Sequence, residues 1–208
     1  MRSRRAPVSR FLAAFAAVLA CAHAAQAAGV AVSVVDPAGR PLADAVVTLE
    51  PVGTRAPVKP LAGVQVEQVD RRFVPQVSVV TVGTPVAFPN HDTVRHHVYS
   101  FSPVKTFELK LYAGMPHEPV VFDRPGVAVL GCNIHDQMVA WVVVVDTPFH
   151  ARSGATGRAR IADVPAGGYQ LRVWHSSIPE GVEPATVPLT VAAADVEQRV
   201  VLVQGTPR

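Results

Sequence analysis

The chain has 208 residues, 49% of them hydrophobic, and its 19 lysines and arginines against 16 acids give a formal net charge of +3. Four of the arginines lie within residues 2–10, and residues 1–28 contain no acid. Without those 28 residues, 15 basic residues face 16 acids, and the formal charge becomes −1. No cluster of basic residues remains, which excludes nucleic acid as an expected partner.

Residues 1–28 have the pattern of a secretory signal peptide. Arginines in residues 2–10 precede an apolar run, Phe11 to Ala20, that is too short to span a bilayer, and Ala25-Gln26-Ala27 supplies the small residues of a cleavage site. We expect cleavage after Ala27 or Ala28, although a membrane anchor is the alternative for the same run. No later apolar segment is long enough to cross a membrane, so we expect a periplasmic protein without a transmembrane segment.

The chain contains two cysteines, Cys21 and Cys132. Val18-Leu19-Ala20-Cys21 loosely resembles a lipoprotein box, so lipid anchoring at Cys21 is an alternative fate of the leader. Loss of Cys21 with the leader would leave Cys132 without a partner for an intrachain disulfide. A lone thiol in an oxidising compartment is prone to oxidation unless it is buried or binds a metal.

The residues after the leader predict an all-β protein. Short apolar stretches recur roughly every eight to twelve residues between proline and glycine turn signals, and helical periodicity is absent. The predicted strands cover residues 30–35, 45–49, 76–82, 86–88, 120–122, 127–130, 140–145 and 169–174.

Two motifs near the ends of the mature chain resemble the halves of one module. Residues 34–47 contain a D-x-x-G-x-P-L turn between two strands, and residues 157–173 contain a v-P-x-G-x-Y-x-L-x-V pattern. Both resemble the carboxypeptidase regulatory-like, or transthyretin-like, β-sandwich. The resemblance implies a discontinuous domain, 29–52 plus 147–208, with residues 53–146 inserted as a second domain. One continuous sandwich with long excursions is the alternative.

Three metal-binding side chains lie close together in the inserted segment. Cys132, His135 and Met138 have C-x-x-H-x-x-M spacing between two β-rich runs. Thiolate and imidazole suit copper in both oxidation states, while a thioether favours Cu(I) and often serves as a weak axial ligand. Methionine is a poor zinc ligand. This donor set therefore predicts one Cu(I)/Cu(II) ion, against the alternative of a buried cysteine with incidental histidines.

A trigonal copper plane of one thiolate and two imidazoles requires a second histidine. An upstream turn follows a strand that ends at Asn90 and contains the adjacent pair His96 and His97. Adjacent residues on an extended segment point to opposite faces, so we expect only one of the pair to reach the metal. Strand alternation does not decide whether His96 or His97 is the one that binds the metal.

The V-x-F-x-N strand at residues 86–90, the upstream histidine and the C-x-x-H-x-x-M loop together resemble the cupredoxins, the blue-copper family that includes amicyanin and plastocyanin. The resemblance implies a Greek-key β-sandwich for residues 53–146, inserted in or packed beside the second sandwich. It assigns the metal ligands as His96, Cys132, His135 and Met138. Cupredoxins often have an asparagine after the upstream ligand, where this chain has His97.

Residues 95–146 also resemble bacterial cupredoxin-like proteins that carry the label methylamine utilization protein, which suggests a redox context. The resemblance implies a type 1 (blue) copper protein that is not an enzyme and that transfers single electrons between partners such as a c-type cytochrome or a periplasmic dehydrogenase. His135 would then be the site of electron exchange. The alternative function is a copper-binding, delivery or sensing module without electron transfer.

Overall fold

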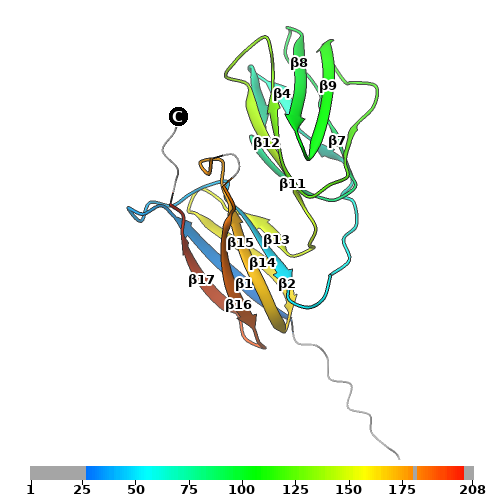
Figure 1. The fold of residues 1–208 in the computed structure, drawn as a ribbon. Helices are drawn as coiled ribbons and strands as arrows, with labels where there is room; N and C mark the ends of the chain where they lie inside the picture. Colours follow the sequence, from blue (N-terminus) through cyan, green and yellow to red (C-terminus); the bar gives the residue numbers. More distant parts are fainter. Residues whose placement is uncertain (1–26, 180–181, 204–208) are drawn as a thin grey trace, which may run out of the picture.

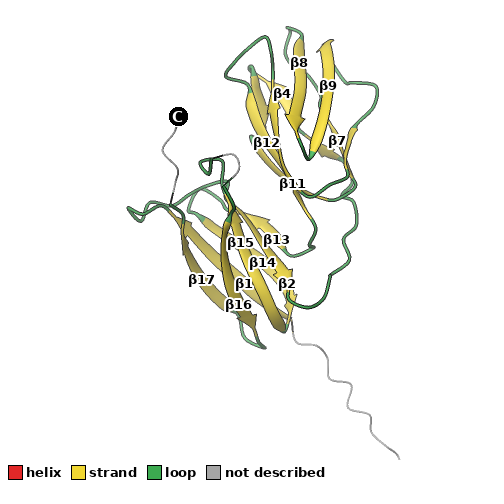
Figure 2. Ribbon diagram, viewed as in Figure 1, coloured by secondary structure: helices red, strands yellow, loops and turns green. Residues whose placement is uncertain are grey.

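A computed structural model describes residues 27–179 and 182–203. These residues form β-strands, turns and loops without any helix, so the all-β prediction is confirmed (Figure 2). The predicted signal peptide lies outside the described residues except for Ala27 and Ala28, which belong to the first strand. Cleavage after Ala27 or Ala28 would shorten this strand by one or two residues. Within the described ranges, no helix is long and apolar enough to cross a membrane.

One group of strands comes from both ends of the described chain and forms two facing sheets. Val30, Val32 and Val34 alternate inward on the first strand and are fully buried, as expected for a sheet with one apolar face. The sheet orders are β14-β1-β17 and β13-β2-β15-β16. The strands are β1 (Ala27–Val35), β2 (Val46–Pro51), β13 (His150–Arg152), β14 (Arg158–Pro165), β15 (Gly167–Trp174), β16 (Ala185–Val191) and β17 (Val196–Val201).

The other group of strands comes from the middle of the chain (Figure 1). A five-stranded sheet with the order β6-β12-β11-β8-β9 is accompanied by the sheet β10-β7-β3 and the hairpin β4-β5. Its apolar core includes Phe88, Phe122 and Leu130. The strands are β3 (Val64–Gln65), β4 (Glu67–Val69), β5 (Arg72–Val74), β6 (Val77–Thr81), β7 (Thr84–Ala87), β8 (His96–Ser102), β9 (Lys105–Tyr112), β10 (Val120–Phe122), β11 (Gly126–Gly131) and β12 (Val139–Val145).

A small third apolar cluster contains residues from both groups. Val46 of β2 packs with Val77 of β6 and Val143 of β12. The rings of Trp141 and Trp174 lie beside this cluster, with their centroids 6.5 Å apart. The predicted boundaries near residues 52 and 147 fall between β2 and β3 and between β12 and β13, and the division into two domains stays a prediction.

Candidate metal centre

Three of the four predicted ligands lie together at one end of the five-stranded sheet. One ligand atom from each of His96, Cys132 and His135 can be chosen so that all three atoms lie within 4.8 Å of one another. The rings of His96 and His135 are 5.1 Å apart between centroids and meet edge to face. His96 is fully buried and Cys132 is 4% exposed, whereas His135 is half-buried.

The strand pairing explains why residues so far apart in sequence meet. His96 is the first residue of β8, Cys132 follows the last residue of β11, and Met138 precedes the first residue of β12. Strand β11 pairs with β12 on one side and with β8 on the other. The loop between β11 and β12 therefore lies beside the start of β8.

The unpaired polar atoms of this cluster fit a copper ion. Nδ1 of His96 and Nδ1 of His135 are both buried, and neither has a hydrogen-bond partner among the described residues. Burying such a nitrogen without a partner is costly, which favours a bound ligand at this point. Cys132 has a free thiol, and thiolate with two imidazoles is a donor set that copper prefers.

Met138, the fourth predicted ligand, lies within the core. Its side chain is 1% exposed and belongs to the same apolar cluster as Cys132. The turn before it is closed by hydrogen bonds from Met138 N to the His135 carbonyl at 2.9 Å and from Val139 N to the Gln137 carbonyl at 3.0 Å. Met138 therefore lies on the same short loop as two members of the cluster.

His97, the rival of His96, has a different environment. It is also buried, and its Nε2 lies at an ion-pair distance of 2.9 Å from Oε1 of Glu108 on the neighbouring strand β9, without forming a hydrogen bond of good geometry. Its ring packs edge to face on Tyr99, at 5.8 Å between centroids. The structure thus brings His96 to Cys132 and His135, and places His97 against a carboxylate of β9.

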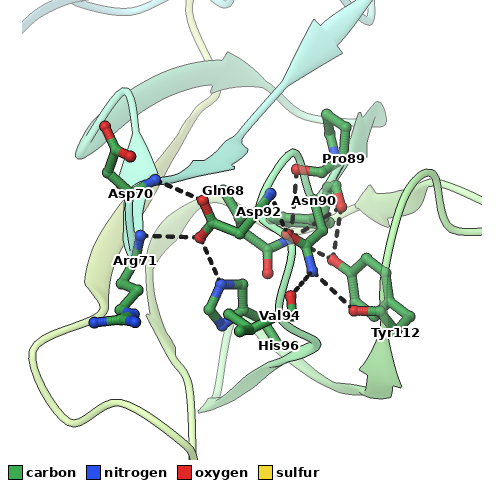
Figure 3. A network of polar contacts seen from close by, with 10 residues as sticks. Gln68, Asp70, Arg71, Pro89, Asn90, Asp92, Val94, His96 and Tyr112 are labelled. Carbon is green, nitrogen blue, oxygen red and sulfur yellow. Dashed lines mark hydrogen bonds and ion pairs between the residues drawn. The ribbon is translucent and has the colours of Figure 1, made fainter.

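A polar network that the sequence did not reveal fixes the loop before His96 (Figure 3). β7 ends at Ala87, and Asn90 follows it in the loop with an almost fully buried side chain. Its amide donates to the carbonyls of Val94 and Tyr112, both at 2.9 Å, and its Oδ1 accepts the backbone N–H of Asp92 at 2.9 Å. The strand motif marks Asn90 in the sequence, but its hydrogen-bond partners depend on the fold.

Asp92 joins this network to His96. Nε2 of His96 lies 2.7 Å from Oδ2 of Asp92, and the carboxylate also accepts the backbone N–H groups of Asp70 and Arg71 at 2.7 and 2.9 Å. Burial by itself raises the pKa of Asp92. The Arg71 N–H, the His96 ring and the Asp70 N–H together lower it by more, so the net pKa is below the ordinary value. Asp92 is therefore a carboxylate at neutral pH.

The residue before Cys132 is constrained by an aromatic ring. A Cβ atom at Gly131 would lie 2.7 Å from Cζ and Oη of Tyr99. Gly131 and Tyr99 are also paired across β11 and β8. The ring of Tyr99 thus packs on the backbone directly before the thiol, and any larger residue at position 131 would force this ring to move.

No family model and no curated protein matches the chain. Among solved structures, the chain is similar to the purple cupredoxin of Nitrosopumilus maritimus, at 22% identity over 39% of this chain and 99% of that one, with a TM-score of 0.36. It is similar to amicyanin from Paracoccus versutus, at 16% identity over 48% of this chain and 97% of that one, with a TM-score of 0.35.

The chain is also similar to the copper-containing nitrite reductase of Thermus scotoductus, at 28% identity and a TM-score of 0.38. That match covers 55% of this chain and 28% of the reductase. These TM-scores are below 0.5, so the similarities do not establish a copper site in this chain. The support for such a site is the cluster of His96, Cys132 and His135.

Proposed function

We propose that this protein binds one copper ion through His96, Cys132, His135 and Met138, and carries single electrons between redox proteins in the periplasm. A c-type cytochrome or a periplasmic dehydrogenase is the kind of partner that this role requires. In this role the protein transforms no substrate. A connection with methylamine metabolism is likewise a proposal.

The observation that carries the proposal is the meeting of two histidines, each with a buried and unpaired Nδ1, at a buried thiol. Nδ1 of His96 and Nδ1 of His135 lack partners among the described residues, and each histidine can place a nitrogen within 4.8 Å of the Cys132 sulfur. The export that residues 1–28 predict would add a second reason, because an unprotected thiol is easily oxidised outside the cytoplasm.

The residues around the site suit electron transfer. A bound copper ion would supply a one-electron Cu(I)/Cu(II) couple. Buried His96 and Cys132 would hold their positions in both oxidation states, and the apolar core that contains Cys132 and Met138 keeps water from these two donors. His135 is half-buried and follows the exposed Ile134 in the chain, so it is the most exposed of the four proposed donors.

The burial of the donors favours a carrier over a copper-delivery module. Cys132 and Met138 are at most 4% exposed, and His96 is fully buried. An acceptor protein would need to reach these atoms to take the metal, which would require the ligand loop to open. Electrons can leave through the half-buried ring of His135 while the ion stays bound.

The experiment is to load purified protein with Cu(II) and record visible and EPR spectra of the wild type and of Cys132→Ser. The expected result is one copper per chain and an intense thiolate-to-copper band that Cys132→Ser lacks. Failure of the wild type to show the band, or its persistence in Cys132→Ser, would overturn the copper–thiolate centre.

A second measurement separates electron transfer from delivery in the loaded protein. A carrier shows a reversible potential and fast electron self-exchange, and retains Cu(I) when mixed with a Cu(I) chelator of moderate affinity. A delivery module instead releases Cu(I) readily to the chelator. Rapid release with slow self-exchange would reject the electron-carrier role.

A further inference from the structure

We propose that Asp92 is a positioning residue for the copper ligand His96, selecting Nδ1 as the metal-binding nitrogen and lowering the reduction potential of the site. This inference rests on the proposed function, because it assigns a role in the copper centre to a residue that does not bind the metal.

The contact between the two side chains determines which nitrogen is free. An ionised carboxylate only accepts hydrogen bonds, so Nε2 of His96, 2.7 Å from Oδ2 of Asp92, must carry the hydrogen. In a neutral imidazole the other nitrogen, Nδ1, is then bare and can bind a metal. This is the nitrogen of His96 that is buried without a partner.

Asp92 is itself held by a separate part of the fold. Asp70 and Arg71, in the turn between β4 and β5, have φ of 51° and 58°, a left-handed conformation that is uncommon for residues other than glycine. Their successive N–H groups both donate to the carboxylate, one to Oδ1 and the other to Oδ2. Figure 3 shows the carboxylate of Asp92 between this turn and the ring of His96. The hairpin β4-β5 thus holds the carboxylate of Asp92 in place, and this carboxylate holds the ring of His96.

The negative charge has a predictable effect on a copper ion bound to His96. A carboxylate that accepts the N–H of a ligating imidazole makes the ring a stronger donor and restricts its orientation. A stronger donor and a nearby negative charge both stabilise Cu(II) relative to Cu(I). Asp92 therefore lowers the reduction potential and maintains the ring position when the oxidation state changes.

The neighbouring histidine provides a matched control within the same strand. His97 also contacts a carboxylate, Glu108, at 2.9 Å, but it is not part of the donor cluster. Glu108→Gln removes one negative charge near the site without touching His96. A comparison of Asp92→Asn with Glu108→Gln thus separates an effect through the His96 ring from a general effect of charge.

The first test measures copper affinity and midpoint potential in the full chain. We expect Asp92→Asn to weaken Cu(II) binding about 10–100-fold. If the affinity for Cu(II) falls about tenfold more than the affinity for Cu(I), the potential rises by ~59 mV for this one-electron couple. Glu108 is about half exposed and its charge is screened, so Glu108→Gln should change the potential by less than about a third of that shift.

The second test needs no copper, and it therefore distinguishes the positioning role from the proposed function. In metal-free wild type, the nitrogen chemical shifts of His96 should report hydrogen on Nε2 and a bare Nδ1. Asp92→Ala should lose this preference, while Glu108→Gln keeps it. Circular dichroism of each variant checks that the β-fold is retained.

The outcomes separate the two claims. If copper binds and Asp92→Asn shifts the potential no more than Glu108→Gln does, the positioning role is wrong and the copper function stands. Hydrogen on Nδ1 of His96 in metal-free wild type would also reject it. If the wild type binds no copper at all, the proposed function fails, and the inference that rests on it fails too.

Discussion

The two loops that supply the candidate ligands are organised in different ways. In the upstream loop, Asn90 and Asp92 make hydrogen bonds through their side chains to backbone groups of four other residues and to His96. In the downstream loop, from Cys132 to Met138, the described hydrogen bonds are two backbone contacts that close a turn. The protein thus builds one half of the site with polar contacts, and the other half depends on burial of Cys132 and Met138 and, in the proposed function, on the metal.

The largest expected effect is the response of the two loops to copper. A ligand present at about 1,000 times its dissociation constant stabilises the bound state by about 4.1 kcal/mol. Amides of residues 132–138 whose exchange requires loss of the metal should therefore exchange up to about 1,000-fold more slowly in the Cu(I) form. Amides of residues 90–96 should be slowed much less. Equal slowing of hydrogen exchange in the two loops would contradict the claim that they are organised differently.

The next largest effect is expected from Asn90→Ala. The change leaves the carbonyls of Val94 and Tyr112 without the donor from Asn90, and the N–H of Asp92 without its acceptor. We expect the metal-free protein to lose about 2–4 kcal/mol of unfolding free energy, measured by urea titration. Asn133 of the downstream loop is exposed, so Asn133→Ala is the matched control and should change stability by less than about 0.5 kcal/mol. Similar losses in both variants would show that the upstream loop is not more tightly held.

A smaller effect is expected where the downstream loop leaves β11. Gly131→Ala forces a Cβ against the ring of Tyr99 and should cost about 1–3 kcal/mol in thermal or urea unfolding. Gly154→Ala is the control, because nothing lies within 4 Å of the added methyl group. Equal stability of the two variants would mean that the ring of Tyr99 moves without cost.

The smallest effect concerns Tyr112, whose hydroxyl donates to the Phe88 carbonyl and accepts from Gln68, both at 2.6 Å. Tyr112→Phe should lose about 1 kcal/mol near neutral pH. Burial raises the pKa of Tyr112 to about 12, the Gln68 hydrogen bond lowers it, and the charge of Cys132 raises it.

The pH dependence of Tyr112 has a definite sign. Since the folded pKa exceeds the unfolded value of about 10, the stability from neutral Tyr112 is complete below pH 10 and is lost as the pH rises through about 12. The advantage of the wild type over Tyr112→Phe should shrink across this window. An advantage that stays constant to pH 12 would contradict the raised pKa.

The strands that sequence patterns predicted are those with clear apolar runs. All eight predicted strands overlap observed ones, and the prediction for residues 120–122 coincides with β10. The hairpin β4-β5 gave no such signal, because its turn has left-handed Asp70 and Arg71 instead of the usual asparagine and glycine. The sequence predicted a donor set from spacing, but strand alternation alone could not distinguish His96 from His97.

The role of Asp92 could not be read from the sequence for a different reason. Its contacts join residues 21 and 22 positions apart, and they exist only because the hairpin β4-β5 packs beside the upstream loop. An aspartate four residues before a histidine has no particular meaning outside a helix. Its significance depends on the fold, whereas the chemistry of Cys132, His135 and Met138 depends on residue type and local spacing.

The most direct test of the account is the copper spectrum of two adjacent variants, His96→Ala and His97→Ala, measured under identical loading against the wild type. The structure places His96 in the cluster with Cys132 and His135, and places His97 against Glu108. His96→Ala should abolish the thiolate-to-copper band of the wild type, and His97→Ala should keep it. An intact band in His96→Ala, or loss of the band in His97→Ala alone, would contradict the proposed centre.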